Sequence, residues 1–374
     1  MTRVKIVILN WNGRDYLERF LPSLVSRTPG AGIVVADNGS TDDSVRFLER
    51  SYPQVELLRL DRNYGYAEGY NRALAGLNAE YFVLLNSDVE VTEGWLDPLV
   101  RTLDGDGSVA AVSPKIRSFG EPDKFEYAGA AGGFIDFLGY PFCRGRILDS
   151  IESDKGQYDD PREVFWASGA CMAVRADVFR SLGGFDGDFF AHMEEIDFCW
   201  RAQLAGYAVR VEPRSCVLHV GGGTLPNNSP QKIYLNFRNN LCMLFKNLSP
   251  LSFWPVLFAR MALDGAAALV FLVQGRPDFF RQVFRAHIDF HRRRSSLHRK
   301  RRAIQRGRVA RSRWIFFGSI VLRHAHGVPY LAGVPLRISF ARSFCRKRSL
   351  AALRTDFGSG NDYVTCSLSS KWKF

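Results

Sequence analysis

The chain has 374 residues, of which 46% are hydrophobic and 24% are charged. These values are ordinary for a globular protein with a sizeable core, and the length predicts one large domain with an appendage or two modest domains. Seven cysteines are scattered without CxxC pairs. This pattern argues against a zinc site or a disulfide framework and favours reduced thiols in the cytoplasm.

The net charge of +12 is concentrated in one stretch of the chain. Residues 292–313 hold eleven Lys and Arg residues and no acid, so the remainder is nearly neutral. A local basic patch is suited to the phosphates of lipid headgroups or of nucleic acid. The stretch has no interleaved aromatic side chains on which bases would stack, and we therefore expect an anionic membrane surface as its partner.

Residues 1–115 alternate between strand and helix patterns. Short apolar runs bounded by polar turns predict buried strands. Strands are expected at 4–9, 33–36, 55–60 and 81–85, and helices at 44–50 and 67–77. This alternation predicts a parallel α/β sheet, in which ligands bind beyond the carboxyl ends of the strands. Asp37 and Asp88 follow two such ends and are expected on one edge of the sheet.

Residues 116–162 are rich in Gly, Pro and Asp and carry little periodicity, so we expect a long loop over the site. Regular patterns return after this loop. The expected strands are 165–174, 209–211 and 217–218, and the expected helices are 176–182 and 195–204.

The character of the chain changes after residue 230. Residues 251–274 are strongly apolar, but Arg260 and Asp264 interrupt them at a spacing that lets the two side chains pair on a helix. We expect a helix lying in the membrane interface, or a buried helical hairpin, in preference to a membrane span. The predicted divisions are residues 1–230, a helical membrane-associating region at 231–308, and a tail at 309–374.

Asp37 lies in the segment VADNGSTDD at the end of the second expected strand. A carboxylate at this place is able to accept the imide N–H of uracil or thymine. Asp, Asn and Ser also form plain turns that cap a helix. The segment taken alone therefore leaves both interpretations open.

A second acidic segment, NSDVE at 86–90, places carboxylate oxygens near one point. Such hard ligands suit Mg²⁺ or Mn²⁺ bridged to a diphosphate, with Asp88 as the better ligand. His219 ends another expected strand, and a neutral imidazole is able to complete the metal shell. Surface turns with alternating acids and structural histidines are common, so neither feature is specific by itself.

Three acids, Glu194, Glu195 and Asp197, lie at the start of the last helix before residue 230. The helix dipole favours ionised carboxylates there, and a general base must be ionised to accept a proton. The alternative is an acid-rich first turn that faces solvent. Phe189 and Phe190 just upstream favour a partly closed site instead.

Together these segments resemble the family 2 glycosyltransferases of the GT-A fold, and most closely their bacterial rhamnosyltransferase-type members. The resemblance covers roughly residues 3–225. It rests on eight features in the family's order, namely ILNWNG, ADNGSTDDS, NYGYAEGYN, LLNSDVEV, FWASGACMAVR, GGFDGDFF, MEEIDFCWR and then His219. It implies a Rossmann-like α/β domain that uses a nucleotide-diphosphate-sugar, followed here by a C-terminal helical, membrane-associating appendage.

The resemblance implies that Asp37 binds the nucleotide base, that Asp88 and His219 hold Mg²⁺ or Mn²⁺, and that Glu195 is the catalytic base. Two departures are visible: the metal motif reads Asn-Ser-Asp where the family often has Asp-x-Asp, and the base motif reads Glu-Glu where it often has Glu-Asp. The other residues expected to contact the substrates are Asn10, Asn63, Gly65, Asn71, Asn86, Ser87, Trp166, Glu194, Asp197 and Arg201.

The expected enzyme moves a sugar, rhamnose among the candidates, from a UDP- or dTDP-linked donor to a glycan or lipid-linked acceptor. Transfer would invert the anomeric carbon, at the inner face of the cell membrane and in cell-surface polysaccharide synthesis. A sugar nucleotidyltransferase is the first alternative, but it would usually carry a basic glycine-rich loop where residues 10–13 read NWNG. A non-catalytic membrane-surface protein is the second, and it would not need these acids in this order.

Overall fold

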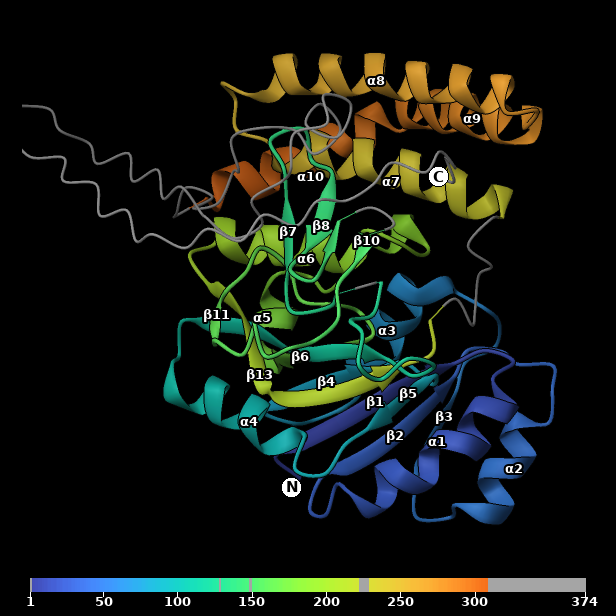
Figure 1. The fold of residues 1–374 in the computed structure, drawn as a ribbon, viewed down its shortest axis with the longest axis vertical. Helices are drawn as coiled ribbons and strands as arrows, with labels where there is room; N and C mark the ends of the chain where they lie inside the picture. Colours follow the sequence, from blue (N-terminus) through green and yellow to red (C-terminus); the bar gives the residue numbers. More distant parts are fainter. Residues whose placement is uncertain (1, 128, 148–149, 222–228, 309–374) are drawn as a thin grey trace, which may run out of the picture.

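The computed structural model describes residues 2–127, 129–147, 150–221 and 229–308. Its centre is a nine-stranded sheet with the order β11-β13-β6-β12-β4-β1-β2-β3, to which β5 adds by pairing with β13 (Figure 1). The strands are β1 Val4–Asn10, β2 Gly32–Asp37, β3 Glu56–Arg59, β4 Tyr81–Leu85, β5 Val89–Val91, β6 Val109–Ser118, β11 Arg162–Glu163, β12 Cys171–Arg175 and β13 Ala208–His219.

The first half of the sheet has the predicted parallel arrangement. β1 pairs in parallel with both β2 and β4, and β2 pairs in parallel with β3. The predicted strands at 4–9, 33–36, 55–60 and 81–85 are confirmed to within about one residue at each end. Because parallel strands end on the same side of a sheet, the turns after β1, β2 and β4 share one edge.

Side chains alternate between the two faces of the sheet, as the pleat requires. Ile6 and Ile8 pack on one face with α1 Arg14–Ser26, α2 Ser44–Ser51 and α4 Leu96–Gly105. Val7 points to the opposite face, where the sheet packs against α3 Gly65–Ala75, α5 Ala176–Ser181 and α6 Glu194–Leu204. The helices predicted at 44–50, 67–77, 176–182 and 195–204 are therefore confirmed, and each packs on one face of the sheet.

The second half of the sheet corrects the prediction of a purely parallel sheet. β12 runs antiparallel to both β4 and β6, so the sheet is mixed. A buried apolar run predicts a strand but carries no information about its direction. The strand predicted at 165–174 is also too long, since only Cys171–Arg175 forms a strand of the main sheet, and Trp166 makes an isolated bridge to Gly133.

The region 116–162 is not the single long loop that its composition predicts. It contains the end of β6, β11 and a separate antiparallel sheet of β7 Gly133–Ile135, β8 Pro141–Cys143, β9 Arg146–Ile147 and β10 Ser150–Ile151. Strands of two or three residues show too little alternation to be detected in a sequence. The strands predicted at 209–211 and 217–218 are one strand, β13, whose pairing with β6 shifts between Glu212 and Cys216.

Four helices follow the sheet and form a separate part of the molecule, here called the helical half. They are α7 Pro230–Asn247, α8 Phe253–Val273, α9 Pro277–Arg292 and α10 Arg294–Arg306. In Figure 1, α7 and α10 lie nearest to the sheet half and α8 lies outermost. The predicted pairing in α8 is confirmed, since Arg260 Nη2 lies 3.1 Å from Asp264 Oδ1. By length and composition alone, α8 is the one helix in the described residues that is able to cross a membrane, with a mean hydropathy of 2.0 over its apolar window.

Candidate active site

The turns after β1 and β2 bring Asn10 and Asp37 together. These two residues are paired across the strands, and Asn10 Nδ2 lies 3.2 Å from Asp37 Oδ1. The other carboxylate oxygen, Oδ2, accepts a hydrogen bond from the backbone N–H of Ser40 at 3.0 Å. Asp37 therefore closes the turn, as one of the two interpretations expected. Its role toward a nucleotide base stays a prediction.

Asn63 and Gly65 lie at the start of α3. Asn63 Oδ1 accepts a hydrogen bond from the backbone N–H of Gly65 at 2.8 Å and from Asn38 Nδ2 at 3.1 Å. Gly65 has a φ of +76°, and a Cβ there would stand 2.5 Å from the Phe190 carbonyl oxygen. Only glycine fits this close approach. These residues of the NYGYAEGYN motif thus order the backbone around the site.

Asn71 also orders backbone, further along α3. Its side chain both donates to the Phe185 carbonyl at 2.9 Å and accepts from the Phe185 N–H at 2.9 Å. Asn71 of α3 therefore holds the backbone before α6, and its predicted contact with substrate stays untested.

Asp88 and His219 come together at the sheet edge, as predicted. His219 pairs with Val89 across β13 and β5, which places its Nε2 atom 3.1 Å from Asp88 Oδ1. Glu126 lies on the other side of the ring, with Oε2 3.5 Å from His219 Nδ1. Burial lowers the pKa of His219, but hydrogen bonds to both carboxylates outweigh it and raise the pKa to about 10. Glu126 was missed because no motif surrounds it in a region predicted as loop.

The donor set fits a divalent cation in its chemistry and its number. A carboxylate and an imidazole converge on one point, with Asp88 Oδ1 and His219 Nε2 3.1 Å apart. The described residues contain no group of three or more His, Cys, Asp and Glu side chains able to hold a metal. Mg²⁺ and Mn²⁺ commonly bind through one or two protein ligands, with substrate phosphates and water completing the shell, so Asp88 and His219 suffice only when the donor is bound.

Asn86 and Ser87 connect the Asp88–His219 pair to the neighbouring turns. The backbone N–H of Asn86 donates to the Ala170 carbonyl at 3.0 Å. Ser87 faces the turn after β1, since a Cβ added at Gly13 would stand 3.4 Å from its Oγ. Trp166, by contrast, is 5% exposed and donates through Nε1 to the Phe134 carbonyl at 3.0 Å. It lies in the core beneath the small sheet.

The acids of α6 divide into two kinds. Asp197 is fully buried and accepts hydrogen bonds from Arg201 Nε at 2.9 Å and Asn247 Nδ2 at 2.8 Å, with Lys246 Nζ also 2.9 Å away. Arg201 further donates to the Leu182 carbonyl at 2.7 Å. Asp197 and Arg201, both expected at the substrates, are therefore engaged within the protein, and the contacts indicate that they hold α6 in place.

Neither Glu194 nor Glu195 has a cationic partner or a side-chain hydrogen-bond donor among the described residues, although backbone N–H groups at the helix start contact the carboxylate of Glu195. The Oε2 atom of each is buried and lacks a hydrogen-bond partner among the described residues. Burial raises the pKa of Glu195 to about 7, and burial together with the charge of Glu195 raises the pKa of Glu194 well above its ordinary value. A carboxylate that has no cationic partner and a pKa near neutrality has the properties of a general base.

Gly169 lies beside Glu195, on a turn that is hydrogen-bonded to the segment that carries Asp88. A Cβ added at Gly169 would stand 3.8 Å from Glu195 Cδ and 2.9 Å from the Tyr66 hydroxyl. Tyr66 donates to the Gly169 carbonyl at 2.6 Å, and the next residue, Ala170, accepts from Asn86. Hydrogen bonds and close contacts therefore connect the segment that carries Asp88, the 168–170 turn and the start of α6.

Comparisons with known proteins agree with this geometry. Residues 5–183 match the family described as Glycosyl transferase family 2. A similar protein is the N-acetylglucosaminyl-diphospho-decaprenol L-rhamnosyltransferase of Mycobacterium tuberculosis, 31% identical over 233 residues that cover 57% of this chain and 75% of the relative. The pre-mycofactocin glycosyltransferase of the same organism is 30% identical over 225 residues, covering 58% of this chain and 42% of that protein.

Solved structures share the fold. GalNAc-T7 with UDP, GalNAc and Mn²⁺ superimposes with a TM-score of 0.51 at 18% identity, covering 66% of this chain and 48% of that one. S. aureus TarS 1–349 with UDP-GlcNAc gives a TM-score of 0.50 at 15% identity, covering 89% and 99%. At these identities the likeness concerns the fold, which is of the GT-A type with a mixed central sheet. On the strength of the sequence relatives and this fold, the chain belongs to glycosyl transferase family 2 and is a glycosyltransferase.

Proposed function

We propose that the protein is an inverting, metal-dependent glycosyltransferase that moves a sugar from a UDP- or dTDP-linked donor to a glycan or lipid-linked acceptor. Rhamnose is the first sugar to test, because the 31% identical relative is a rhamnosyltransferase that acts on a diphospho-decaprenol. One observation carries the proposal. Glu195, whose buried Oε2 lacks a hydrogen-bond partner among the described residues, lies beside Gly169, and the next residue, Ala170, accepts a hydrogen bond from the backbone of Asn86, two residues before Asp88.

On the donor side, Asn10 and Asp37 are proposed to receive the pyrimidine base at the carboxyl ends of β1 and β2. Asp88 and His219 would hold Mg²⁺ or Mn²⁺. The bound cation supplies neutralisation of the charge that builds on the leaving nucleoside diphosphate. Asn86 and Ser87 order the turn that aims Asp88.

On the acceptor side, Glu195 accepts the proton of the attacking hydroxyl. The hydroxyl oxygen forms a bond to the anomeric carbon as the bond from that carbon to the diphosphate oxygen breaks. The nucleoside diphosphate leaves with the electron pair, and the proton stays on the Glu195 carboxylate. A single base with attack opposite the leaving group inverts the anomeric carbon.

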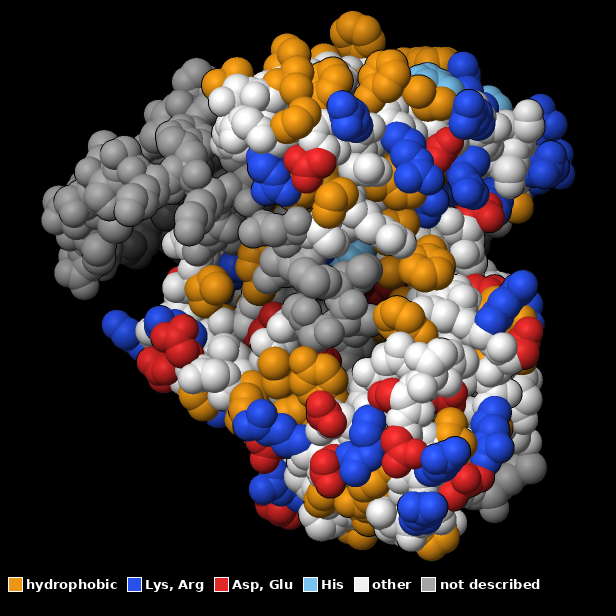
Figure 2. All heavy atoms as spheres, turned by 90° about the vertical axis from the view of Figure 1, so that its right-hand side faces the viewer, with side chains coloured by type: hydrophobic (Ala, Val, Ile, Leu, Met, Phe, Trp, Pro, Cys, Tyr) orange, Lys and Arg blue, Asp and Glu red, His pale blue; other side chains and the backbone are white. Residues whose placement is uncertain are grey.

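We further propose that α8 lies on the membrane surface and does not cross it. Its charged residues point inward: Arg260 lies over the ring of Tyr140 and pairs with Asp264, and both charged side chains are buried. Large apolar side chains point outward, among them Trp254 at 64% and Phe258 at 77% exposure. Figure 2 shows such side chains gathered on the outer edge of the helical half, with Lys and Arg beside them. An exposed apolar surface of this kind fits an interfacial helix.

The basic run contributes only some of its residues to the proposed membrane surface. Arg301 Nη1 donates to the carbonyls of Phe245 and Leu248, both at 2.8 Å, and so completes the end of α7. The exposed arginines of the run that we propose for lipid phosphates are Arg292, Arg294, Arg299, Arg302 and Arg306, and Arg281 and Arg285 of α9 precede them. Arg311 and Arg313, the last two basic residues of the run, lie outside the described residues. The proposed location is therefore peripheral, on the cytoplasmic face of the cell membrane.

A donor screen tests the enzymatic proposal. Nucleoside diphosphate release is measured for UDP- and dTDP-linked sugars with a polyprenyl-diphospho-sugar acceptor, with Mg²⁺, with Mn²⁺ and with excess EDTA. We expect release that needs acceptor and metal, and loss of it in Asp88→Asn. Full activity in EDTA would contradict the metal role. Pyrophosphate release from a sugar 1-phosphate and a nucleoside triphosphate would instead identify a nucleotidyltransferase.

A further inference from the structure

The segment that leads into α6 has an unusual backbone. Between the short 3-10 helix η1 Gly187–Phe189 and α6, three residues other than glycine have positive φ: Phe190 at 67°, His192 at 71° and Met193 at 72°. Side chains with a Cβ rarely adopt this conformation, which persists only where the surroundings enforce it. Glu195 follows two residues later, so whatever holds residues 186–193, here called the α6 entry loop, also sets the position of Glu195.

Asn239 of α7 holds the carbonyl groups of this loop. Its side chain is fully buried, and Nδ2 donates to the carbonyls of Phe189 at 3.0 Å, Ala191 at 2.8 Å and His192 at 2.8 Å. Its Oδ1 accepts from Arg238 Nε at 2.9 Å, which orients the amide so that the donor faces the loop. One side chain thus contacts three carbonyl groups of the loop, and backbone polar groups that are shielded from water need such partners.

The opposite side of the loop is held by α3. The backbone N–H groups of Tyr66 and Ala67 donate to the Phe190 carbonyl at 2.6 Å and 3.1 Å. Because Gly65 has no side chain, the backbones of α3 and of the entry loop approach closely. Phe190, with its positive φ, is therefore held between α3 and the Asn239 side chain of α7.

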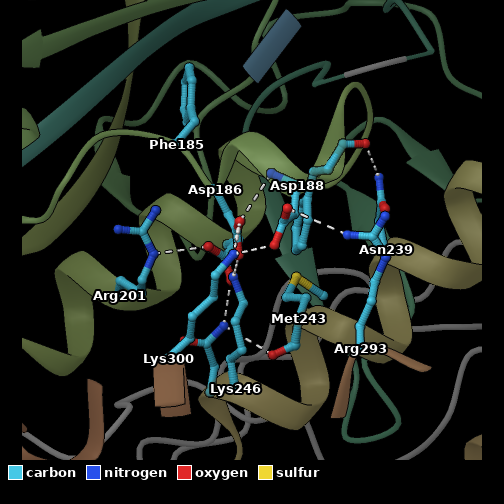
Figure 3. A network of polar contacts seen from close by, with 12 residues as sticks. Phe185, Asp186, Asp188, Arg201, Asn239, Met243, Lys246, Arg293 and Lys300 are labelled. Atoms are coloured by element: carbon cyan, nitrogen blue, oxygen red, sulfur yellow. Dashed lines mark hydrogen bonds and ion pairs between the residues drawn. The ribbon is translucent and has the colours of Figure 1, made fainter. Parts of the chain in front are cut away.

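A cluster of charged residues joins the same loop to the C-terminal helices (Figure 3). Lys246 Nζ of α7 lies 2.5 Å from Asp186 Oδ2 and 2.9 Å from Asp197 Oδ1, and so joins the loop to α6. Lys300 Nζ of α10 pairs with Asp186 and lies 2.7 Å from Asp188 Oδ2. Two acids of the loop are therefore pinned by cations from two different helices.

We propose that Asn239 is a positioning residue for transfer, which acts through the α6 entry loop to hold Glu195 against the acceptor. The proposal rests on Glu195 being the base, as proposed above. A base displaced by about 1 Å loses on the order of a hundredfold in rate, so a loop with three left-handed residues needs such a restraint. Asn239 lies beyond residues 5–183, the segment of the chain that matches the family. The helical half thereby completes the active site.

The test compares Asn239→Ala with Asn240→Ala. Asn240 is the neighbouring buried residue of α7, donates to the Gly139 carbonyl at 2.8 Å and reaches the entry loop only through a 4.0 Å contact with the Met193 sulfur. Each change is also made in the Glu195→Gln background. The kcat of transfer, the KM and Kd of the donor, and the thermal midpoint are measured for all variants, using the donor that the screen identifies.

We expect Asn239→Ala to lower kcat by roughly tenfold to a hundredfold with donor Kd unchanged, and Asn240→Ala to stay within about twofold of wild type. In the Glu195→Gln background, Asn239→Ala should cause no further loss, because a residue that works only through the base has nothing left to position. An equal loss in both backgrounds, or equal losses for Asn239→Ala and Asn240→Ala, would overturn the proposal.

Asn239→Asp covers the case in which the alanine variant does not fold. It is nearly isosteric and keeps the acceptor for Arg238 while it removes the donor. If both Asn239 variants fail to fold and Asn240→Ala folds, the role is structural and the proposal is wrong. Failure of the proposed function is seen separately, in the Glu195→Gln single variant: wild-type turnover there removes Glu195 as the base whatever Asn239 does.

Discussion

Helices α7 and α8 are neighbours in the chain, yet they differ in how much of their surface the rest of the protein covers. Twelve of the eighteen residues of α7 are buried, among them Arg238, Asn239 and Lys246. α8 exposes Trp254 and Phe258 over most of their surface. Buried polar groups require partners, and those of α7 find them in the α6 entry loop and in Asp197. Exposed apolar groups require a surface outside the protein.

The contrast indicates two distinct roles within residues 231–308, although the sequence predicts one membrane-associating unit there. Changes around α6 and α7 should reduce turnover or folding and leave membrane binding intact. Changes on the outer face of α8 should do the reverse. Any variant that disturbs both properties together would weaken this division.

Glu195→Gln should have the largest effect. It keeps the size of the side chain and removes its ability to accept a proton, so we expect transfer to fall by roughly 10² to 10⁴. Metal-dependent donor binding, measured by calorimetry, and flotation with anionic liposomes should match wild type. If Glu194→Gln is inactive while Glu195→Gln turns over normally, the neighbouring carboxylate is the base.

Lys246→Met should mainly reduce stability. It removes the cation between Asp186 and Asp197 and leaves both carboxylates buried with fewer partners. Breaking a buried ion pair in this way costs about 3–5 kcal/mol, which chemical denaturation measures. Arg46→Met is the control, because the Arg46–Asp43 pair is 3.8 Å long and exposed and should contribute about 1 kcal/mol or less. Equal losses for the two variants would show that the Lys246 cluster does not hold the fold.

Trp254→Glu and Phe258→Glu test the other side of the comparison. Full burial of a large apolar side chain is worth about 1.5–3 kcal/mol, so each change should weaken binding to anionic liposomes by roughly tenfold to a hundredfold. Transfer to a water-soluble acceptor analogue should be unchanged. Ile151→Glu serves as the control, since Ile151 is 40% exposed but lies on β10. Unaltered flotation of both α8 variants would place the membrane contact elsewhere.

The pH dependence of kcat/KM tests the charge state of Glu195. Burial raises the pKa of Glu195 to about 7 beside Glu194, Tyr66 and Cys199. Only the ionised base accepts a proton, so kcat/KM should fall about tenfold per pH unit below this value. A flat profile from pH 5 to 8 would contradict the assignment.

The contribution of Glu195 to stability should fall as the pH rises, whereas kcat/KM should increase. With its pKa raised above the ordinary 4.5, Glu195 binds more protons in the folded state. Its contribution to stability is therefore present below about pH 4.5 and is lost as the pH rises through about 7. The difference in unfolding free energy between wild type and Glu195→Gln, measured across this range, checks the sign.

Much of the site was predictable from local patterns. Apolar runs ending in polar turns located β1, β2 and β4, and with them the edge that carries Asp37 and Asp88. Acids at a helix start located Glu195. These features depend on residues close together in the chain, where strand and helix periodicity is strong.

The order of the motifs, the family and most of the residues proposed for the chemistry follow from the amino-acid sequence. Tertiary packing decides that β12 runs antiparallel, that Glu126 stands behind His219, that Asp197 is paired while Glu195 is not, and that α7 holds the α6 entry loop. Each of these facts depends on contacts between distant segments: His219 and Asp88 are 131 positions apart, and Asn239 is 50 positions from Phe189. Periodicity reports how one segment buries its own face, whereas the partner of a buried polar group is chosen by packing of the whole chain.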